Sequence, residues 1–303
     1  MTLVRTTQNM LSRQSFTGMQ AAMARVAKAQ EQLSTGRLIN RPSDDPTGAT
    51  TAMRIRSSLA SEKQFVRNAD SAVGWLDQTD GTLSTIGNQL SRARDIALQG
   101  ANTGAMGPEA RLALATEVDQ IREGLITSAN TQYLDRPIFG GITAGQKAYH
   151  PDGTLADPDA VNLGSVGGVH RTIADGVRMR IDLEGPQVFG GSPDSVFDHL
   201  AALSAALKSA DSVGIEAAID RLKVDADRVT NAQSEIGART VRVERARDVA
   251  TDAHLTLTNA LSEVENVDLA RATVDLGLQE VAYQAALGAT ARVLQPSLLD
   301  FLR

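Results

Sequence analysis

The stretch "LSTGRLINRPSDDPTGAT", from Leu33 to Thr50, lies between two segments that both show helical periodicity. Gly36 can adopt the left-handed backbone conformation that commonly ends a helix. Asp45 can cap the helix that follows, and Pro46 suits its first position. The sequence therefore predicts one helix that ends at Gly36, a second that begins at Pro46, and a non-helical connector over residues 37–44.

The segment before the connector carries a single apolar stripe with heptad spacing. The stripe shifts by one residue after Leu11, which indicates a local change of register. Its members are Val4, Leu11, Met19, Val26 and Leu33. We predict a terminal helix that presents this stripe to a partner.

Two much longer helical patterns lie on either side of the middle of the chain. The first covers residues 52–97, and no proline interrupts it before Pro108. The second places an apolar residue at every seventh position from Ile215 to Val264. Uninterrupted patterns of this length are typical of coiled coils and long bundles, so we expect a rod of paired helices.

Residues 140–193 differ in composition, because they hold 11 of the 25 glycines and four of the nine prolines. Within them, "VHRTIADGVRMRIDLEG" places an apolar residue at every second position from Val177 to Leu183, the period of a half-buried strand. The pair Asp175-Gly176 is a strong signal for a tight hairpin turn. The sequence predicts a small β-rich domain inserted into a helical frame.

The C-terminal helical pattern is set off from the long helix before it by a register break near Asn266. Heptad spacing then resumes until Pro296, which must kink or end the helix. The last residues, "SLLDFLR", stay apolar although chain termini are usually polar. The stripe and tail comprise Leu269, Leu276, Tyr283, Leu287, Leu294, Leu298, Leu299 and Phe301. An apolar terminus of this kind needs a partner that covers it.

These breaks predict that the two terminal helices pair with each other. Residues 1–36 and 266–303 would form a terminal-helix assembly domain, 37–139 and 194–265 a long-helix core domain, and 140–193 the β-rich inserted domain. The predicted fold class is mainly α, a long antiparallel helical rod resembling a coiled-coil bundle, with a small β-rich domain inserted mid-chain.

Composition argues against several classes of protein. The chain has no cysteine, which excludes disulfides, thiolate metal sites and cysteine nucleophiles. Its net charge is −6 and its basic residues are dispersed, so no footprint for nucleic acid is present. No apolar run of about 18 residues predicts a membrane span. The N-terminus lacks the features of a cleaved secretory signal, which by itself suggests a cytoplasmic protein.

Several segments resemble bacterial flagellin-type proteins. "LSTGRLINRPSDDPTGA" resembles the junction between their terminal and first core domains. "SRARDIALQGANTG" is similar to the segment where one of their long helices ends, and "SEVENVDLARATVDL" and "VLQPSLLDFLR" resemble their C-terminal helices. The similarity covers residues 1–140 and 195–303, with both ends in the family's order.

Within this family, four segments most resemble the subunits that join hook to filament. They are "DRPIFGG", the hairpin sequence quoted above, "SEIGARTVRVERA" and the ending "LLDFLR". One departure is Pro137-Ile138 before Phe139, where those subunits more often have an aromatic pair.

The resemblance implies an extracellular structural subunit of the flagellum at the hook–filament junction. It would be exported by the flagellar type III apparatus without a cleaved signal peptide, with help from an export chaperone. Its partners would be a ring of identical subunits, the other hook-associated junction protein and flagellin. The resemblance implies no enzyme activity, no cofactor, no metal, no nucleic acid and no membrane insertion.

The resemblance also assigns roles to residues singled out above. The two terminal stripes would form the subunit-assembly surface. Independently of the resemblance, Pro42 pushes Arg41 toward an extended backbone, so we expect residues 37–44 to form an extended connector, and its polar residues would make the contacts if it bridges neighbouring subunits. The connector residues of interest are Arg37, Asn40, Arg41, Pro42, Asp44 and Asp45.

Other classes of function stay open at this stage. A flagellin is the alternative within the family, and a cytoplasmic coiled-coil adaptor would also lack a signal peptide. An enzyme carried by residues 140–193 would need convergent polar side chains, and none can be named. Asp44 and Asp45 are better explained by helix capping than by catalysis. The four histidines, His150, His170, His199 and His254, do not have the spacing of metal ligands.

Overall fold

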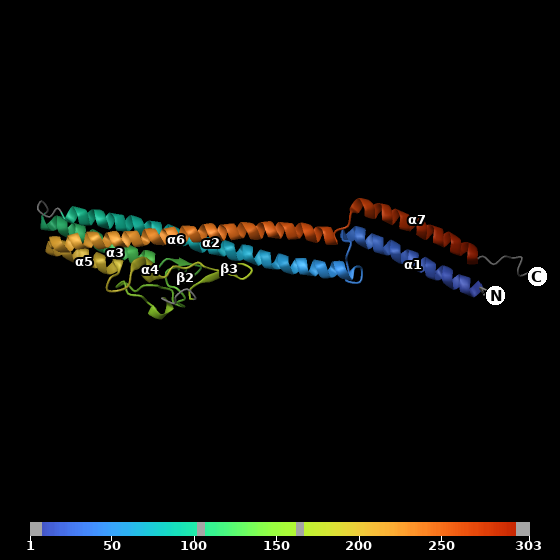
Figure 1. The fold of residues 1–303 in the computed structure, drawn as a ribbon, viewed down its shortest axis with the longest axis horizontal. Helices are drawn as coiled ribbons and strands as arrows, with labels where there is room; N and C mark the ends of the chain where they lie inside the picture. Colours follow the sequence, from blue (N-terminus) through green and yellow to red (C-terminus); the bar gives the residue numbers. More distant parts are fainter. Residues whose placement is uncertain (1–7, 102–106, 162–166, 295–303) are drawn as a thin grey trace, which may run out of the picture. The chain divides into compact units, whose positions relative to one another are not determined.

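A computed structural model describes residues 8–101, 107–161 and 167–294 of the chain. The fold is mainly α (Figure 1). The long helices come from both ends of the chain, and the strands lie between them in sequence. The helices are α1 (Gln8–Thr35), α2 (Pro46–Ala101), α3 (Pro108–Ala129), α4 (Gly185–Phe189), α5 (Val196–Ser209), α6 (Ser212–Glu265) and α7 (Leu269–Leu294).

The strands form two small antiparallel sheets. In the first, β1 (Gln132–Tyr133) pairs with β2 (Arg136–Pro137). In the second, β3 (His170–Ala174) pairs with β4 (Val177–Arg180) across the predicted turn. The predicted fold class, mainly α with a small β-rich segment mid-chain, is thereby confirmed.

The chain divides into two compact units. The terminal unit comprises Met1–Ser61 and His254–Arg303, and the central unit comprises Glu62–Ala253. Both units contain parts of α2 and α6. The division into three domains that the sequence suggests stays a prediction.

The predicted helix boundaries around the connector are confirmed. Helix α1 ends at Thr35, and Gly36 has a φ of +68°, as the left-handed end of a helix requires. Helix α2 begins at Pro46, and the Asp45 carboxylate accepts a hydrogen bond from the Thr47 amide at 3.0 Å. Local capping chemistry thus fixes where both helices stop and start.

One hydrophobic core joins the helices of the central unit to the segment between them. The predicted stripe of α6 is buried from Ile215 to Ala250. Aromatic rings from the β-rich segment complete this core. Phe189 lies at its centre, with ring centroids 5.1 Å from Phe139 and 5.3 Å from both Tyr149 and Phe197. The segment therefore packs its apolar side chains against those of the helices.

The hairpin departs from the predicted alternation at two places. Val177 is exposed, whereas the pattern placed it on the buried face with Met179. The pairing is irregular between Thr172 and Ala174, and a bulge of this kind re-aims the side chains that follow it. Strand β4 also ends at Arg180, so Leu183 is buried from an irregular segment.

Candidate subunit-assembly surface

Two connectors lie side by side in the terminal unit, one between α1 and α2 and the other between α6 and α7. The Leu38 amide donates to the Glu265 carbonyl at 2.7 Å, and the Val267 amide donates to the Gly36 carbonyl at 3.0 Å. An antiparallel bridge between Arg37 and Asn266 lies between these bonds. Residues 36–38 and 265–267, far apart in sequence, are therefore joined by antiparallel backbone hydrogen bonds between the two connectors.

The Asp44 side chain holds residues 40–44 of the first connector in a turn by accepting hydrogen bonds from backbone amides earlier in the connector. Its Oδ2 accepts from the Asn40 amide at 3.2 Å and from the Arg41 amide at 2.9 Å. Its Oδ1 lies 3.1 Å from Lys28 Nζ on α1. The Arg41 amide and then the Lys28 ammonium lower the pKa of the Asp44 carboxyl. The connector is not helical, as predicted, but residues 41–44 form a turn rather than an extended segment.

A second set of contacts holds the connector against the end of α1. Arg41 Nη2 lies 3.3 Å from Glu31 Oε1, and Gln32 Nε2 donates to the Leu38 carbonyl at 3.0 Å. At the start of α2, Arg56 reaches Glu265 at 2.7 Å, and Glu265 is buried. The Arg41–Glu31 pair is exposed and contributes little to stability, whereas the Arg56–Glu265 pair joins a half-exposed arginine to a buried carboxylate.

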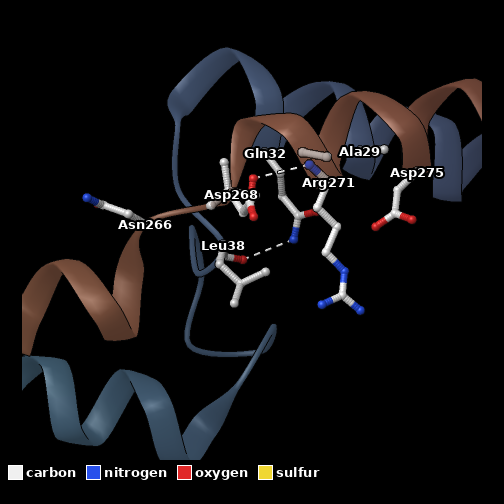
Figure 2. A pocket seen from close by; sticks show the side chains of 9 residues that line it. Ala29, Gln32, Leu38, Asn266, Asp268, Arg271 and Asp275 are labelled. Atoms are coloured by element: carbon white, nitrogen blue, oxygen red, sulfur yellow. Dashed lines mark hydrogen bonds between the residues drawn. The ribbon is translucent and has the colours of Figure 1, made fainter.

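A pocket of about 480 Å³ lies beside the paired connectors. Figure 2 shows Gln32 reaching toward Leu38, with Asp268 at the beginning of α7. The Asp268 carboxylate caps α7 by accepting from the amides of Ala270 and Arg271. The lining residues are Ala29, Gln32, Leu38, Asn266, Val267, Asp268, Arg271, Ala272 and Asp275.

Helices α1 and α7 pack against each other in an antiparallel pair (Figure 1). Ala22 and Ala272 are buried at this seam, and Arg25 Nε donates to Gln279 Oε1 at 3.1 Å across it. The other less exposed positions recur at heptad spacing on both helices. They are Ser15, Met19, Val26, Ala29 and Leu33 on α1, and Leu276, Gln279, Tyr283, Ala286 and Thr290 on α7. Glu31 and Gln32, near the end of α1, are also less exposed but lie off this spacing.

Helix α7 carries a second apolar stripe that the sequence analysis missed. Val274, Leu278 and Val281 are 63%, 62% and 65% exposed. They follow i, i+4, i+7 spacing, which places them on one face, roughly opposite Leu276 at 100° per residue. Helix α1 likewise exposes Phe16 and Met23, seven residues apart. A helix that is apolar on two faces is usually buried on both.

The predicted assembly residues thus fall into four groups. Met19, Val26, Leu33, Leu276 and Tyr283 are half-buried between α1 and α7, while Leu269 and Leu287 are exposed. Leu11 and Leu294 lie within the helices, and their side chains are not described. Val4, Leu298, Leu299 and Phe301 lie outside the described residues. Whether any of them contacts a second subunit stays a prediction.

The structure also bears on the other candidate sites. Among residues 8–101, 107–161 and 167–294, no three His, Asp or Glu side chains are grouped to hold a metal ion. Within the same ranges, no helix is long and apolar enough to cross a membrane. Parts of the glycine-rich sequences "GANTG" and "GSVGG" lie outside the described residues.

Comparisons with known proteins agree with this architecture. Residues 7–143 match the bacterial flagellin N-terminal helical region, and residues 219–302 match the bacterial flagellin C-terminal helical region. Flagellar hook-associated protein 3 of Escherichia coli is 24% identical to the chain, over 93% of the chain and 95% of the relative. A flagellin of Halalkalibacterium halodurans is 26% identical, over 91% of each.

A solved structure shows the same fold. The crystal structure of flagellar hook-associated protein 3 from Legionella pneumophila superposes with a TM-score of 0.59 at 15% identity. The superposition covers 70% of this chain and 98% of the other. The two family regions account for most of the chain, at its two ends and in the family's order. The chain belongs to the bacterial flagellin family, is similar over nearly its whole length to flagellar hook-associated protein 3, and is a structural protein of the flagellum and not an enzyme.

Proposed function

We propose that the chain is the structural subunit that joins hook to filament and that its terminal helices assemble it. The observation that carries this proposal is the exposed stripe of Val274, Leu278 and Val281 on a helix whose opposite face already packs on α1. Large apolar side chains exposed together mark surfaces that a partner covers. Identical subunits in a ring would cover this stripe on every copy.

The proposed partners follow from the same resemblance. Copies of the chain would form the ring, with the other hook-associated junction protein on one side and flagellin on the other. Export by the flagellar type III apparatus would proceed without a cleaved signal, and a chaperone would cover the apolar terminal segments beforehand. The assembled protein would be extracellular, at the hook–filament junction.

The connector would take part in this assembly as well. Arg37, Arg41, Asp44 and Asp45 are its charged residues, and all but Asp44 are exposed. Asn40 and Pro42 shape the turn that presents them. In this proposal, a neighbouring subunit competes for the same carboxylate and guanidinium groups that now pair with Lys28 and Glu31.

A flagellin is the second candidate, because the flagellin of H. halodurans matches nearly the whole chain. Antibody labelling of intact flagella separates the two functions. A junction protein gives one cluster of label where hook meets filament, whereas a flagellin gives label along the filament. Label confined to the cytoplasm would contradict both candidates and favour an adaptor.

A further inference from the structure

His199 is buried in the central unit with a carboxylate on each of its ring nitrogens. It lies in the first turn of α5 and is 3% exposed. Its Nδ1 lies 2.7 Å from Asp225 Oδ2 on α6, and its Nε2 lies 2.7 Å from Asp194 Oδ1 in the loop before α5. Two ion-pair geometries on one imidazole are unusual, because a neutral ring carries a single N–H.

The two hydrogen bonds determine how many protons the cluster holds. An ionised carboxylate only accepts, so both bonds form only if the ring is doubly protonated or one carboxyl is protonated. Either arrangement contains one proton more than a neutral histidine beside two ionised aspartates. The geometry therefore specifies a retained proton, whichever atom carries it.

Arg228 is a second cation at this cluster. Its Nη1 donates to Asp225 Oδ1 at 2.8 Å, and the Asp225 side chain is 1% exposed. With the extra proton, His199, Arg228, Asp194 and Asp225 carry two positive and two negative charges. Without it, Arg228 still balances Asp225, and the excess negative charge falls on Asp194, whose side chain is largely exposed. Arg221 on α6 also faces Asp194, and Asp198 on α5 is held by Ser195.

The pKa directions of the two carboxyls fit this picture. Burial raises the pKa of Asp225, against the opposing effects of His199 and Arg228. The His199 ring lowers the pKa of Asp194, which is largely exposed. A proton shared between His199 and Asp225, with Asp194 ionised, satisfies both directions.

The cluster joins the loop at the end of the β-rich segment to helices α5 and α6. The loop of residues 190–195 leads from α4 into α5. Gly190 has a φ of +80°, and a Cβ there would lie 2.9 Å from Arg228 Nη1 and 2.6 Å from the Asp194 carbonyl. The loop therefore packs closely on α6, and His199 bonds both to the loop and to α6.

We propose that His199 is a proton-dependent clamp, in which one proton shared with Asp194 and Asp225 fastens the end of the β-rich segment to α6, and whose release in alkaline solution loosens it. This inference is independent of the proposed place of the protein in the flagellum. It concerns a device within the central unit alone.

The test is urea unfolding of the full chain between pH 6 and pH 9. An unfolded histidine has a pKa of about 6.5, and the proposed clamp keeps its proton above that pH, so the folded state would hold one proton more than the unfolded state. The folded-to-unfolded ratio should then fall by up to about tenfold per pH unit, and the stabilisation is present below this range and lost as pH rises. His199→Gln, which cannot take up the proton, should lose this slope.

His150→Gln is the matched control, because His150 is exposed. It should keep the wild-type slope. Parallel pH profiles for the wild type and His199→Gln would overturn the clamp. If His199→Gln does not fold, imidazole ¹⁵N and carboxyl ¹³C NMR of the wild type at pH 8 decides. A doubly protonated ring or a protonated Asp225 supports the clamp, and a neutral ring beside two ionised carboxylates overturns it.

Discussion

Lys28 Nζ on α1 lies 3.1 Å from Asp44 Oδ1 in the connector, so the last turns of the terminal helix hold the segment that leads to α2. The same carboxylate accepts two backbone amides through its other oxygen. Asp45, next to it, does a different task, because it caps α2. The adjacent residues Asp44 and Asp45 thus have different roles, one in the connector turn and one in capping α2, and separate substitutions can test each role.

Asp44→Ala should weaken incorporation into the flagellum and leave the melting temperature of the monomer within a few degrees, because its ion pair with Lys28 is half-exposed. Asp45→Ala should instead lower monomer stability by about 1 kcal/mol through loss of the cap. Asp252→Ala, at an exposed position of α6, is the control for both. If Asp44→Ala greatly lowers monomer stability while incorporation stays normal, Asp44 stabilises the monomer and does not take part in assembly.

The connector turn should depend on pH. The pKa of Asp44 is lowered from 3.8, first by the Arg41 amide and then by Lys28. A carboxyl with a depressed pKa stabilises the fold above its ordinary value and loses this contribution as pH falls through the depressed one. The Arg41 amide resonance should titrate with a midpoint below 3.8, and Lys28→Ala should move it upward. A midpoint at or above 3.8 in the wild type would contradict the turn.

A side chain at Gly48 should displace two neighbouring side chains. A Cβ there would lie 2.3 Å from Asp45 Oδ2 and 2.5 Å from Ile39 Cδ1. Because Asp45 caps α2, Gly48→Ala should destabilise the chain by no more than the loss of that cap, about 1 kcal/mol. Gly18→Ala is the matched control, because nothing lies within 4 Å of its Cβ position in α1. It should stabilise that helix by up to about 1 kcal/mol. Equal melting curves for the two variants would refute the close packing at Gly48.

The terminal helices should be marginal before assembly. Ala22 and Ala272 are the only apolar residues that α1 and α7 bury fully among those the structure describes. Two helices with so small a seam gain little from packing. Amide exchange on the dilute monomer should show residues 8–35 and 270–294 largely unprotected. Slow exchange there, in a sample shown to be monomeric, would mean that the helix pair is stable by itself.

The parts of the fold that the sequence predicted depend on local chemistry. Gly36, Asp45 and Pro46 set the backbone conformation or the hydrogen bonds of their immediate neighbours in the chain, so the helix ends they mark can be predicted from sequence. The paired connectors could not be foreseen, because Leu38 and Glu265 come together only through the tertiary fold. The same holds for His199 and Asp225, which no spacing rule for metal ligands would join.

The seam between α1 and α7 was not foreseen in full for a similar reason. Heptad counting favours large residues and selected Leu269 and Leu287, which are exposed in the single chain, so whether they contact a second subunit stays a prediction. The seam in fact continues through Ala272, Gln279 and Ala286, whose small or polar side chains gave no apolar signal. The stripe of Val274, Leu278 and Val281 was visible in the sequence at i, i+4, i+7 spacing, but a single-stripe interpretation overlooked it.

The most direct test of the account compares two leucines on opposite faces of α7, Leu278 on the exposed stripe and Leu276 at the seam with α1. Truncating a leucine in a packed core costs about 2–5 kcal/mol. For Leu278→Ala, that cost should fall on assembly alone.

The measurement takes two readings from each strain, the melting temperature of the purified monomer and the amount of filament protein loose in the medium. Leu278→Ala should leave the melting temperature unchanged and release filaments into the medium. Leu276→Ala should also weaken assembly, and of the two variants only Leu276→Ala should change the melting temperature. Filaments that stay attached in the Leu278→Ala strain would contradict assembly through the outer face of α7.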